Sequence, residues 1–244
     1  MERGPRLNSA LFARHIPAMR PLFTAVLTAF SLVFASGAYA QGPAQPQAQG
    51  LAQGQAQAQG QAQADVAQVE QYFNSVRTMQ ARFVQTNPDG STVQGTLSIS
   101  RPGKMRFEYD PPSKLKVVAD GLQVTMWDPA TRDFGQWPIG WTAASFLLKD
   151  PFKLSGDLTV ESVRRADGLM QLTVVQTRKP QEGKVIVRVA ENPLQLRGWS
   201  IIDTRGNQVN VALSDLKTGM QLANSLFKYD GPDAGQVMRG GNRN

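Results

Sequence analysis

Residues 93–109 read VQGTLSISRPGKMRFEY, in which apolar and polar residues alternate on both sides of Arg101-Pro102-Gly103. Successive side chains of a β-strand point to opposite faces of a sheet, so the alternation over residues 96–100 and 104–109 predicts two strands, each with one apolar face. The Pro-Gly step between them favours a turn. The stretch therefore predicts two consecutive strands whose apolar faces pack against a core.

The same alternation recurs along the rest of the chain. It covers residues 114–117, 122–126, 158–160, 172–174, 185–189, 199–202 and 209–213. Turn sequences separate these runs, among them residues 110–112, 120–121, 167–168, 182–183 and 205–207. Many short alternating strands with regular turns predict an antiparallel meander. We therefore expect a mainly-β fold with short helices, in which the sheet curls around a core or into a barrel.

A helix is predicted to open the domain, with Asp65 as its N-cap. Its apolar stripe has helical spacing and consists of Val66, Val69, Phe73 and Val76, with Gln80 continuing the period. The polar face carries Gln68, Glu70, Gln71, Asn74 and Arg77.

A second, shorter helix is predicted within residues 141–148, which read WTAASFLL. Thr142 is its expected N-cap, and Pro151 ends it. The segment is apolar on nearly every side, with Trp137 just before it. A short apolar helix inserted into a sheet protein is suited to plug one end of the sheet or to cover a cavity.

The N-terminal 40 residues have the organisation of a secretory signal peptide. Arg14 and Arg20 precede an apolar run over residues 22–35, and Ala38-Tyr39-Ala40 fits a signal peptidase site. An uncleaved membrane anchor is the alternative, but the run is shorter than the ~20 residues that a span needs. No cysteine follows the cleavage site, so we expect a protein that is exported, soluble and free of a lipid anchor of its own.

The segment 41–64 contains only Gln, Ala, Gly, Pro and one Leu. Such a composition does not bury enough apolar surface to offset the entropy of ordering, so we predict a disordered tether. The helix propensity of Ala and Gln is the alternative, against which the scattered glycines argue. Residues 233–244 are Gly-rich and polar and are predicted to be a flexible tail. A single domain over residues 65–232 remains.

The side chains that most often carry catalysis and metal binding are missing from the expected mature chain. The sequence has no cysteine, and its one histidine, His15, precedes the cleavage site. Removal of residues 1–40 leaves a net charge of about +4, without the basic stripe of a nucleic-acid-binding protein. We expect no enzyme, no metal site and no cofactor. A pair of carboxylates distant in sequence is the alternative that the sequence leaves open.

A large apolar surface remains on the inward-facing side of the strands. Its members are Leu97, Ile99, Met105, Phe107, Tyr109, Leu115, Val117, Val124, Met126, Leu158 and Val160. Alternation does not distinguish a packed core from the wall of a cavity. Met105 and Met126 favour a cavity slightly, because methionine adapts to varied apolar shapes.

Three stretches resemble a known family. Residues 93–109 resemble the central signature of the outer-membrane lipoprotein carrier family, LolA. Residues 76–86 are similar to its passage from the helix to the first strand. Ala119-Asp120-Gly121, together with residues 126–129, resembles its next hairpin. The order of these stretches also matches that of the family.

The resemblance implies an unclosed antiparallel β-barrel of about eleven strands covered by a helical lid, with residues 141–148 as the lid helix. It implies a cavity for the acyl chains of lipoproteins that an inner-membrane ABC transporter releases, and delivery to the outer membrane, in some bacteria through the receptor LolB. On this reading the cavity is lined by Leu97, Ile99, Met105, Phe107, Tyr109, Val117, Met126, Trp137, Phe146 and Leu147.

The resemblance also implies that Arg101 donates hydrogen bonds to the backbone of the lid and holds the empty carrier closed. We expect the carrier to be a monomer that does not bind nucleic acid. The alternative function is a binding module of the same fold that senses lipids or lipoproteins and regulates an envelope protein. That role requires a second domain or a dedicated partner, and the chain has room for one domain.

Overall fold

The computed structural model describes residues 46–232. The predicted signal peptide and the predicted tail over residues 233–244 lie outside the described residues. Within the described range, no helix is both long and apolar enough to cross a bilayer.

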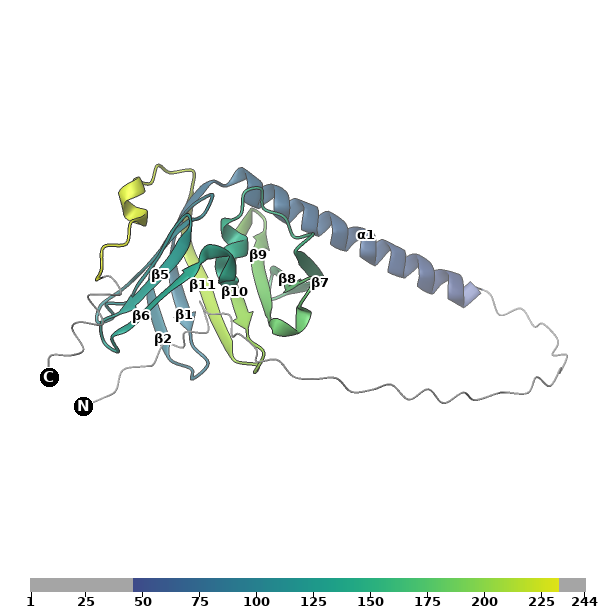
Figure 1. The fold of residues 1–244 in the computed structure, drawn as a ribbon. Helices are drawn as coiled ribbons and strands as arrows, with labels where there is room; N and C mark the ends of the chain where they lie inside the picture. The colour runs from purple at the N-terminus through teal and green to yellow at the C-terminus, as the bar shows by residue number, and fades with distance from the viewer. Residues whose placement is uncertain (1–45, 233–244) are drawn as a thin grey trace, which may run out of the picture. The chain divides into compact units, whose positions relative to one another are not determined.

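The fold is one antiparallel sheet of eleven strands (Figure 1). The strands are β1 (Thr78–Thr86), β2 (Thr92–Ser100), β3 (Lys104–Tyr109), β4 (Lys116–Asp120), β5 (Gln123–Asp128), β6 (Asp133–Pro138), β7 (Leu158–Ala166), β8 (Leu169–Gln176), β9 (Lys184–Glu191), β10 (Leu194–Ile202) and β11 (Gln208–Thr218). Their order is β6-β5-β4-β3-β2-β1-β11-β10-β9-β8-β7. The two edges, β6 and β7, do not pair with each other, so the sheet is unclosed as expected.

The register places the alternating apolar residues on one face. Leu97 of β2 faces Phe107 of β3, which in turn faces Val117 of β4. These side chains join apolar side chains from β1, β5, β8, β9, β10 and β11 in one buried cluster. A sheet whose strands all contribute one face to a single cluster has to curve around it. The hairpin predicted from residues 93–109 is therefore confirmed, with its turn at residues 101–103.

The N-terminal helix α1 (Pro46–Ser75) differs from the prediction at both ends. Residues 46–64, expected to be disordered, are helical, because the helix propensity of Ala and Gln outweighs the cost of the glycines. Asp65 is therefore not an N-cap: it lies inside the helix, buried, and accepts hydrogen bonds of 3.0 Å from Nη1 and Nη2 of Arg165 on β7. Gln80, expected on the helix, belongs to β1.

The predicted second helix is two short 3₁₀ helices, η2 (Ile139–Trp141) and η3 (Ala143–Leu148). Thr142 separates them and makes no side-chain cap, since its Oγ1 donates backwards to the carbonyl oxygen of Ile139 at 2.9 Å. The prediction of one Thr-capped helix is therefore wrong, although the chain does leave η3 before Pro151. Two further 3₁₀ helices are η4 (Pro180–Glu182) and η5 (Asn224–Phe227).

The C-terminal segment packs on the outer face of the sheet. Arg106 alternates with the inward-facing Met105 and Phe107, and its Nη1 donates to the carbonyl oxygen of Leu226 at 3.4 Å. Phe227 is buried there at 2% exposure. The segment therefore braces β3 and β4 from outside and leaves the inner face to the main cluster.

Candidate functional site

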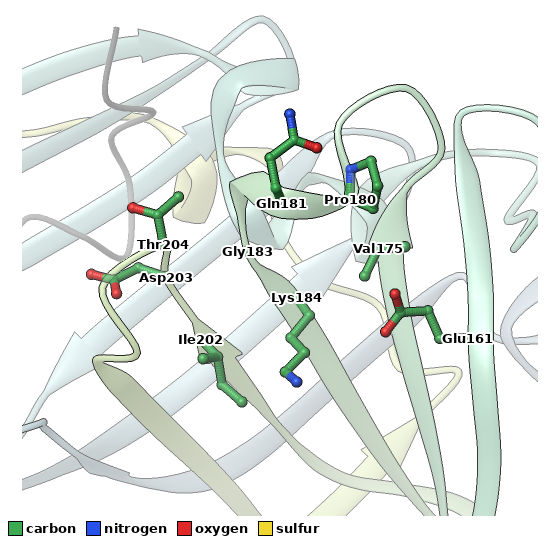
Figure 2. Close-up of a pocket in the computed structure, with 9 residues that line it drawn as sticks. All are labelled: Glu161, Val175, Pro180, Gln181, Gly183, Lys184, Ile202, Asp203 and Thr204. Atoms are coloured by element: carbon green, nitrogen blue, oxygen red, sulfur yellow. The ribbon is translucent and has the colours of Figure 1, made fainter. Parts of the chain in front are cut away.

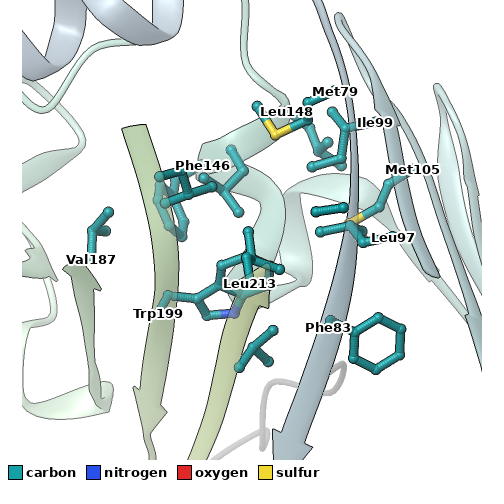
Figure 3. Close-up of a cluster of buried hydrophobic side chains, with 14 of the residues drawn as sticks. Met79, Phe83, Leu97, Ile99, Met105, Phe146, Leu148, Val187, Trp199 and Leu213 are labelled. Atoms are coloured by element: carbon teal, nitrogen blue, oxygen red, sulfur yellow. The ribbon is translucent and has the colours of Figure 1, made fainter. Parts of the chain in front are cut away.

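The ten predicted cavity residues are brought together by the fold. All belong to the main cluster except Trp137, which is half-buried and packs against it. The buried ones are Leu97, Ile99, Met105, Phe107, Tyr109, Val117, Met126, Phe146 and Leu147. They come from β2, β3, β4, β5 and η3, so four neighbouring strands and η3 share one apolar cluster. Figure 3 shows Leu97, Ile99, Met105 and Phe146 in this cluster.

The surface of the sheet has two depressions, one away from this interior and one at its margin. One, of about 310 Å³, is bounded by Glu161 of β7 and by residues near the ends of β8, β9 and β10, including Lys184 and Asp203 (Figure 2). None of the predicted cavity residues lines it. The other, of about 260 Å³, touches Phe107 and Tyr109 where β3 and β4 diverge. The side chains of the interior itself are buried, so a ligand reaches them only if part of the structure moves aside.

Aromatic side chains that the prediction did not include complete the interior. The ring of Phe83 on β1 packs edge-on against Phe107 at a centroid distance of 5.0 Å and against Tyr109 at 5.1 Å. Trp199 on β10 lies edge-on to Phe107 at 6.5 Å. Both are fully buried. Trp199 falls within a predicted strand, and Phe83 alternates with Met79 and Ala81, so strand alternation over residues 78–86 was the signal for Phe83.

Tyr109 is the polar edge of this aromatic group. Its hydroxyl donates to Oε1 of Gln85 at 3.2 Å, and Nε2 of Gln85 donates to Oδ1 of Asn87 at 2.7 Å. Burial raises the pKa of Tyr109 well above its usual value, because the phenolate would lose its hydration. The hydroxyl therefore stays protonated. Among residues 46–232, no group of three or more acidic or histidine side chains is placed to hold a metal ion.

Arg101 connects the end of β2 to residues 139–154, which we call the lid segment. Its Nη1 donates to the carbonyl oxygen of Lys149 at 3.1 Å, just beyond η3. Its Nε and Nη2 donate to the carbonyl oxygen of Val76 at 3.1 and 2.7 Å. Burial lowers the pKa of Arg101, and the nearby charge of Asp150 partly offsets this effect. Arginine remains charged nonetheless, so these are charge-assisted hydrogen bonds.

The turn after Arg101 also contacts the lid segment. The backbone N–H of Gly103 donates to the carbonyl oxygen of Leu148 at 2.9 Å. Gly103 has a φ of +79°, and a Cβ atom there would lie 2.8 Å from Cα of Gly121 in the β4–β5 turn. Glycine is thus required both by the backbone conformation and by the close approach of the two turns. This turn and Arg101 together hold the end of η3.

Helix α1 holds the other end of the lid segment. Nδ2 of Asn74 donates to the carbonyl oxygen of Phe152 at 3.0 Å, and the N–H of Phe152 donates to Oδ1 of Asn74 at 2.8 Å. The N–H of Leu154 donates to Oε1 of Glu70 at 2.6 Å. The ring of Phe73 stacks on that of Phe152 at 4.3 Å. Glu70 and Asn74 were predicted only as part of a polar helix face, because periodicity does not reveal which backbone lies opposite a polar side chain.

Comparison with known proteins gives a consistent result. The family model described as "Outer membrane lipoprotein carrier protein LolA" matches residues 74–230. An outer-membrane lipoprotein carrier protein of Pseudomonas fluorescens is 29% identical over 190 residues, which cover 72% of this chain and 88% of that protein. The one of Methylobacillus flagellatus is 29% identical over 182 residues, covering 71% and 88%.

Two of the solved structures that match this chain have low TM-scores and little sequence in common with it. A LolA superfamily protein from Nitrosomonas europaea has a TM-score of 0.39 and 9% identity, covering 67% of this chain and 97% of its own. The lipoprotein LppX of Mycobacterium tuberculosis has a TM-score of 0.31 and 11% identity, covering 64% and 97%.

Proposed function

The chain belongs to the LolA family of outer-membrane lipoprotein carriers, and on this basis we propose that it takes up the acyl chains of lipoproteins released from the inner membrane and delivers them to the outer membrane. The observation that carries the proposal is the apolar interior of a curved, unclosed sheet, closed by a segment that a buried arginine holds. We propose no catalytic step.

Burial of acyl chains supplies the driving force for uptake. Each CH₂ removed from water contributes about 0.8 kcal/mol, so ten sheltered methylenes contribute about 8 kcal/mol. The side chains that would meet the acyl chains are Leu, Ile, Met, Val and aromatic residues, which offer contact but no charge. Such an interior holds chains of different shapes, which suits a carrier that has to release its cargo.

Opening proceeds in this proposal by displacement of the lid segment. Phe146, Leu147 and Leu148 of η3 are buried in the cluster, and their withdrawal makes room for acyl chains. The hydrogen bonds from Arg101 and Gly103 favour the closed state. Reclosure then competes with bound acyl chains and assists their release at the acceptor membrane.

The proposal places the protein in the periplasm as a monomer, after removal of a signal peptide near Ala40. Its partners would be acylated lipoproteins, the inner-membrane ABC transporter that releases them and, where one is present, a LolB-type receptor. Cargo in complex with the carrier stays in solution because its acyl chains are covered by the sheet and the lid segment.

The test is release of a newly made triacylated lipoprotein from inner-membrane spheroplasts. Wild-type protein added outside is expected to bring the lipoprotein into the supernatant in a complex with itself, and a second incubation with outer membranes is expected to transfer it. Absence of release contradicts a carrier role. Binding without onward transfer to outer membranes points instead to the lipid-sensing module considered as the alternative.

A further inference from the structure

Trp199 presents a hydrogen-bond donor that the protein leaves unused. Its side chain is fully buried, at 0% exposure, and its Nε1 has no hydrogen-bond partner among the described residues. Buried polar groups nearly always have a partner, because an unsatisfied donor loses its hydration without compensation. Indole N–H is a donor only, so what is missing at this position is an acceptor atom.

The surroundings of the indole ring are apolar. Trp199 projects from β10 into the cluster, toward the strands that carry Phe83 and Leu97 (Figure 3). Phe107 lies edge-on to the ring, and the hydroxyl of Tyr109, the nearest polar group of the aromatic set, is engaged by Gln85. The donor therefore lies inside the same interior that the lid segment closes.

We propose that the N–H of Trp199 donates to the carbonyl oxygen of the ester or amide bond that links an acyl chain to the lipoprotein. This inference rests on the proposed function, since it needs acyl chains in the interior. The bond forms when η3 has withdrawn and a chain fills the space. Trp199 is thus a positioning and specificity residue for the acyl linkage.

The chemistry of the interior selects a neutral carbonyl. An ionised carboxylate would lose its hydration among the apolar side chains of this cluster, so it is disfavoured there. A hydrocarbon offers no acceptor at all. Esters and amides are therefore preferred to free fatty acids and to hydrocarbons of similar length, and the carrier distinguishes protein-linked chains from fatty acid anions.

The first test observes the indole N–H of the wild-type protein directly. Isotope-labelled tryptophan gives one N–H resonance for each indole, and the resonance that Trp199→Phe removes is that of Trp199. Titration with methyl palmitate is expected to shift this proton downfield, whereas octadecane, which has no acceptor atom, binds without that shift. The same shift with both ligands, or no shift with bound ester, overturns the inference.

The second test compares affinities through displacement of a fluorescent apolar dye. Relative to octadecane, wild-type protein is expected to bind methyl palmitate roughly five- to tenfold more tightly than Trp199→Phe does. Trp199→Phe retains an apolar ring and is expected to bind octadecane as tightly as the wild type does. Trp127→Phe is the matched control, since Trp127 lies on β5 outside the cluster, and it should keep the wild-type ratio of the two affinities.

The outcomes separate this inference from the proposed function. If no apolar ligand binds, the carrier role itself fails. If both ligands bind and the affinity for the ester relative to octadecane is the same in Trp199→Phe as in the wild type, the carrier role stands and the role of Trp199 is wrong. If Trp199→Phe does not fold, the resonance shift in the wild-type protein decides, with the Trp199 signal identified by substituting the other three tryptophans.

Discussion

Replacement of Arg101 by leucine removes three hydrogen bonds at the junction of sheet, helix and lid segment. Two of them go to the carbonyl oxygen of Val76, which lies between α1 and β1. Only the third, to the carbonyl oxygen of Lys149, reaches the lid segment. A hydrogen bond from a charged donor contributes about 1.5–3 kcal/mol. Arg101→Leu should therefore shift the balance between the closed and open states toward the open one by about ten- to a hundredfold.

The expected phenotype depends on which step of lipoprotein transport, uptake or transfer, needs the closed state. Uptake needs an open interior, so Arg101→Leu should still fold and still release lipoprotein from spheroplasts. Transfer to outer membranes should become slow, because reclosure no longer competes with the bound acyl chains. Arg101→Lys keeps the charge but loses the planar set of N–H donors of the guanidinium group. Its transfer rate should lie between those of the wild type and Arg101→Leu. Hydrogen exchange at the amides of residues 145–152 should accelerate in the leucine variant.

Two results would refute this reasoning. One is transfer by Arg101→Leu at the wild-type rate with unchanged exchange in the lid segment, which would make Arg101 a structural residue of the β2–β3 turn. The other is loss of uptake in a folded variant, which would mean that the bonds to Val76 shape the entrance and not the closing equilibrium.

Three further predictions concern other parts of the interior and its surroundings. Asn74→Ala removes both hydrogen bonds to the backbone of Phe152 and should lower the free energy of unfolding by about 1–3 kcal/mol, measured by urea denaturation. Asn74→Asp keeps the acceptor for the N–H of Phe152 and should lower it less. Equal losses in the two variants would argue against these bonds. Met126→Glu should weaken binding of an apolar dye, because it places a charge at a buried position of the interior. Val84→Glu, at a position 44% exposed, should leave the dye affinity unchanged. Unchanged affinity in a folded Met126→Glu variant would place Met126 away from the ligand. Deletion of residues 41–61 should change the melting temperature by no more than about 2 °C from that of the full chain, because residues 56–61 of α1 are exposed. A larger fall would show that this part of the helix packs on the domain.

The sheet could be predicted because period-two alternation survives wherever one face of a strand is buried. Residues 93–109 show this best, since both strands alternate strictly and the turn contains proline and glycine. Strand β6 (Asp133–Pro138) had no such signal. It is a short edge strand whose pattern of burial is irregular, and it contains a glycine and ends in proline. A strand at the edge of a sheet need not bury one whole face, so its apolar and polar residues need not alternate.

The contacts of the lid segment were only partly predictable. The resemblance to the family implied a latch role for Arg101, which stays a prediction; in the structure its Nη1 donates to the carbonyl oxygen of Lys149. Asn74 and Glu70 bind backbone that is 78 and 84 residues away in the chain. The sequence around a polar helical residue does not indicate a partner so far away in the chain. The helical state of residues 46–64 was missed because glycine was weighed above the propensity of Ala and Gln.

The central claim is that the interior carries lipoprotein acyl chains. Mass spectrometry of the protein isolated from its native periplasm, under conditions that preserve noncovalent complexes, tests this claim most directly. The account predicts that triacylated lipoproteins copurify with the wild-type protein and accumulate on the Arg101→Leu variant, from which onward transfer is slow. A single fixed small ligand, or the absence of any acylated protein from both samples, would contradict it.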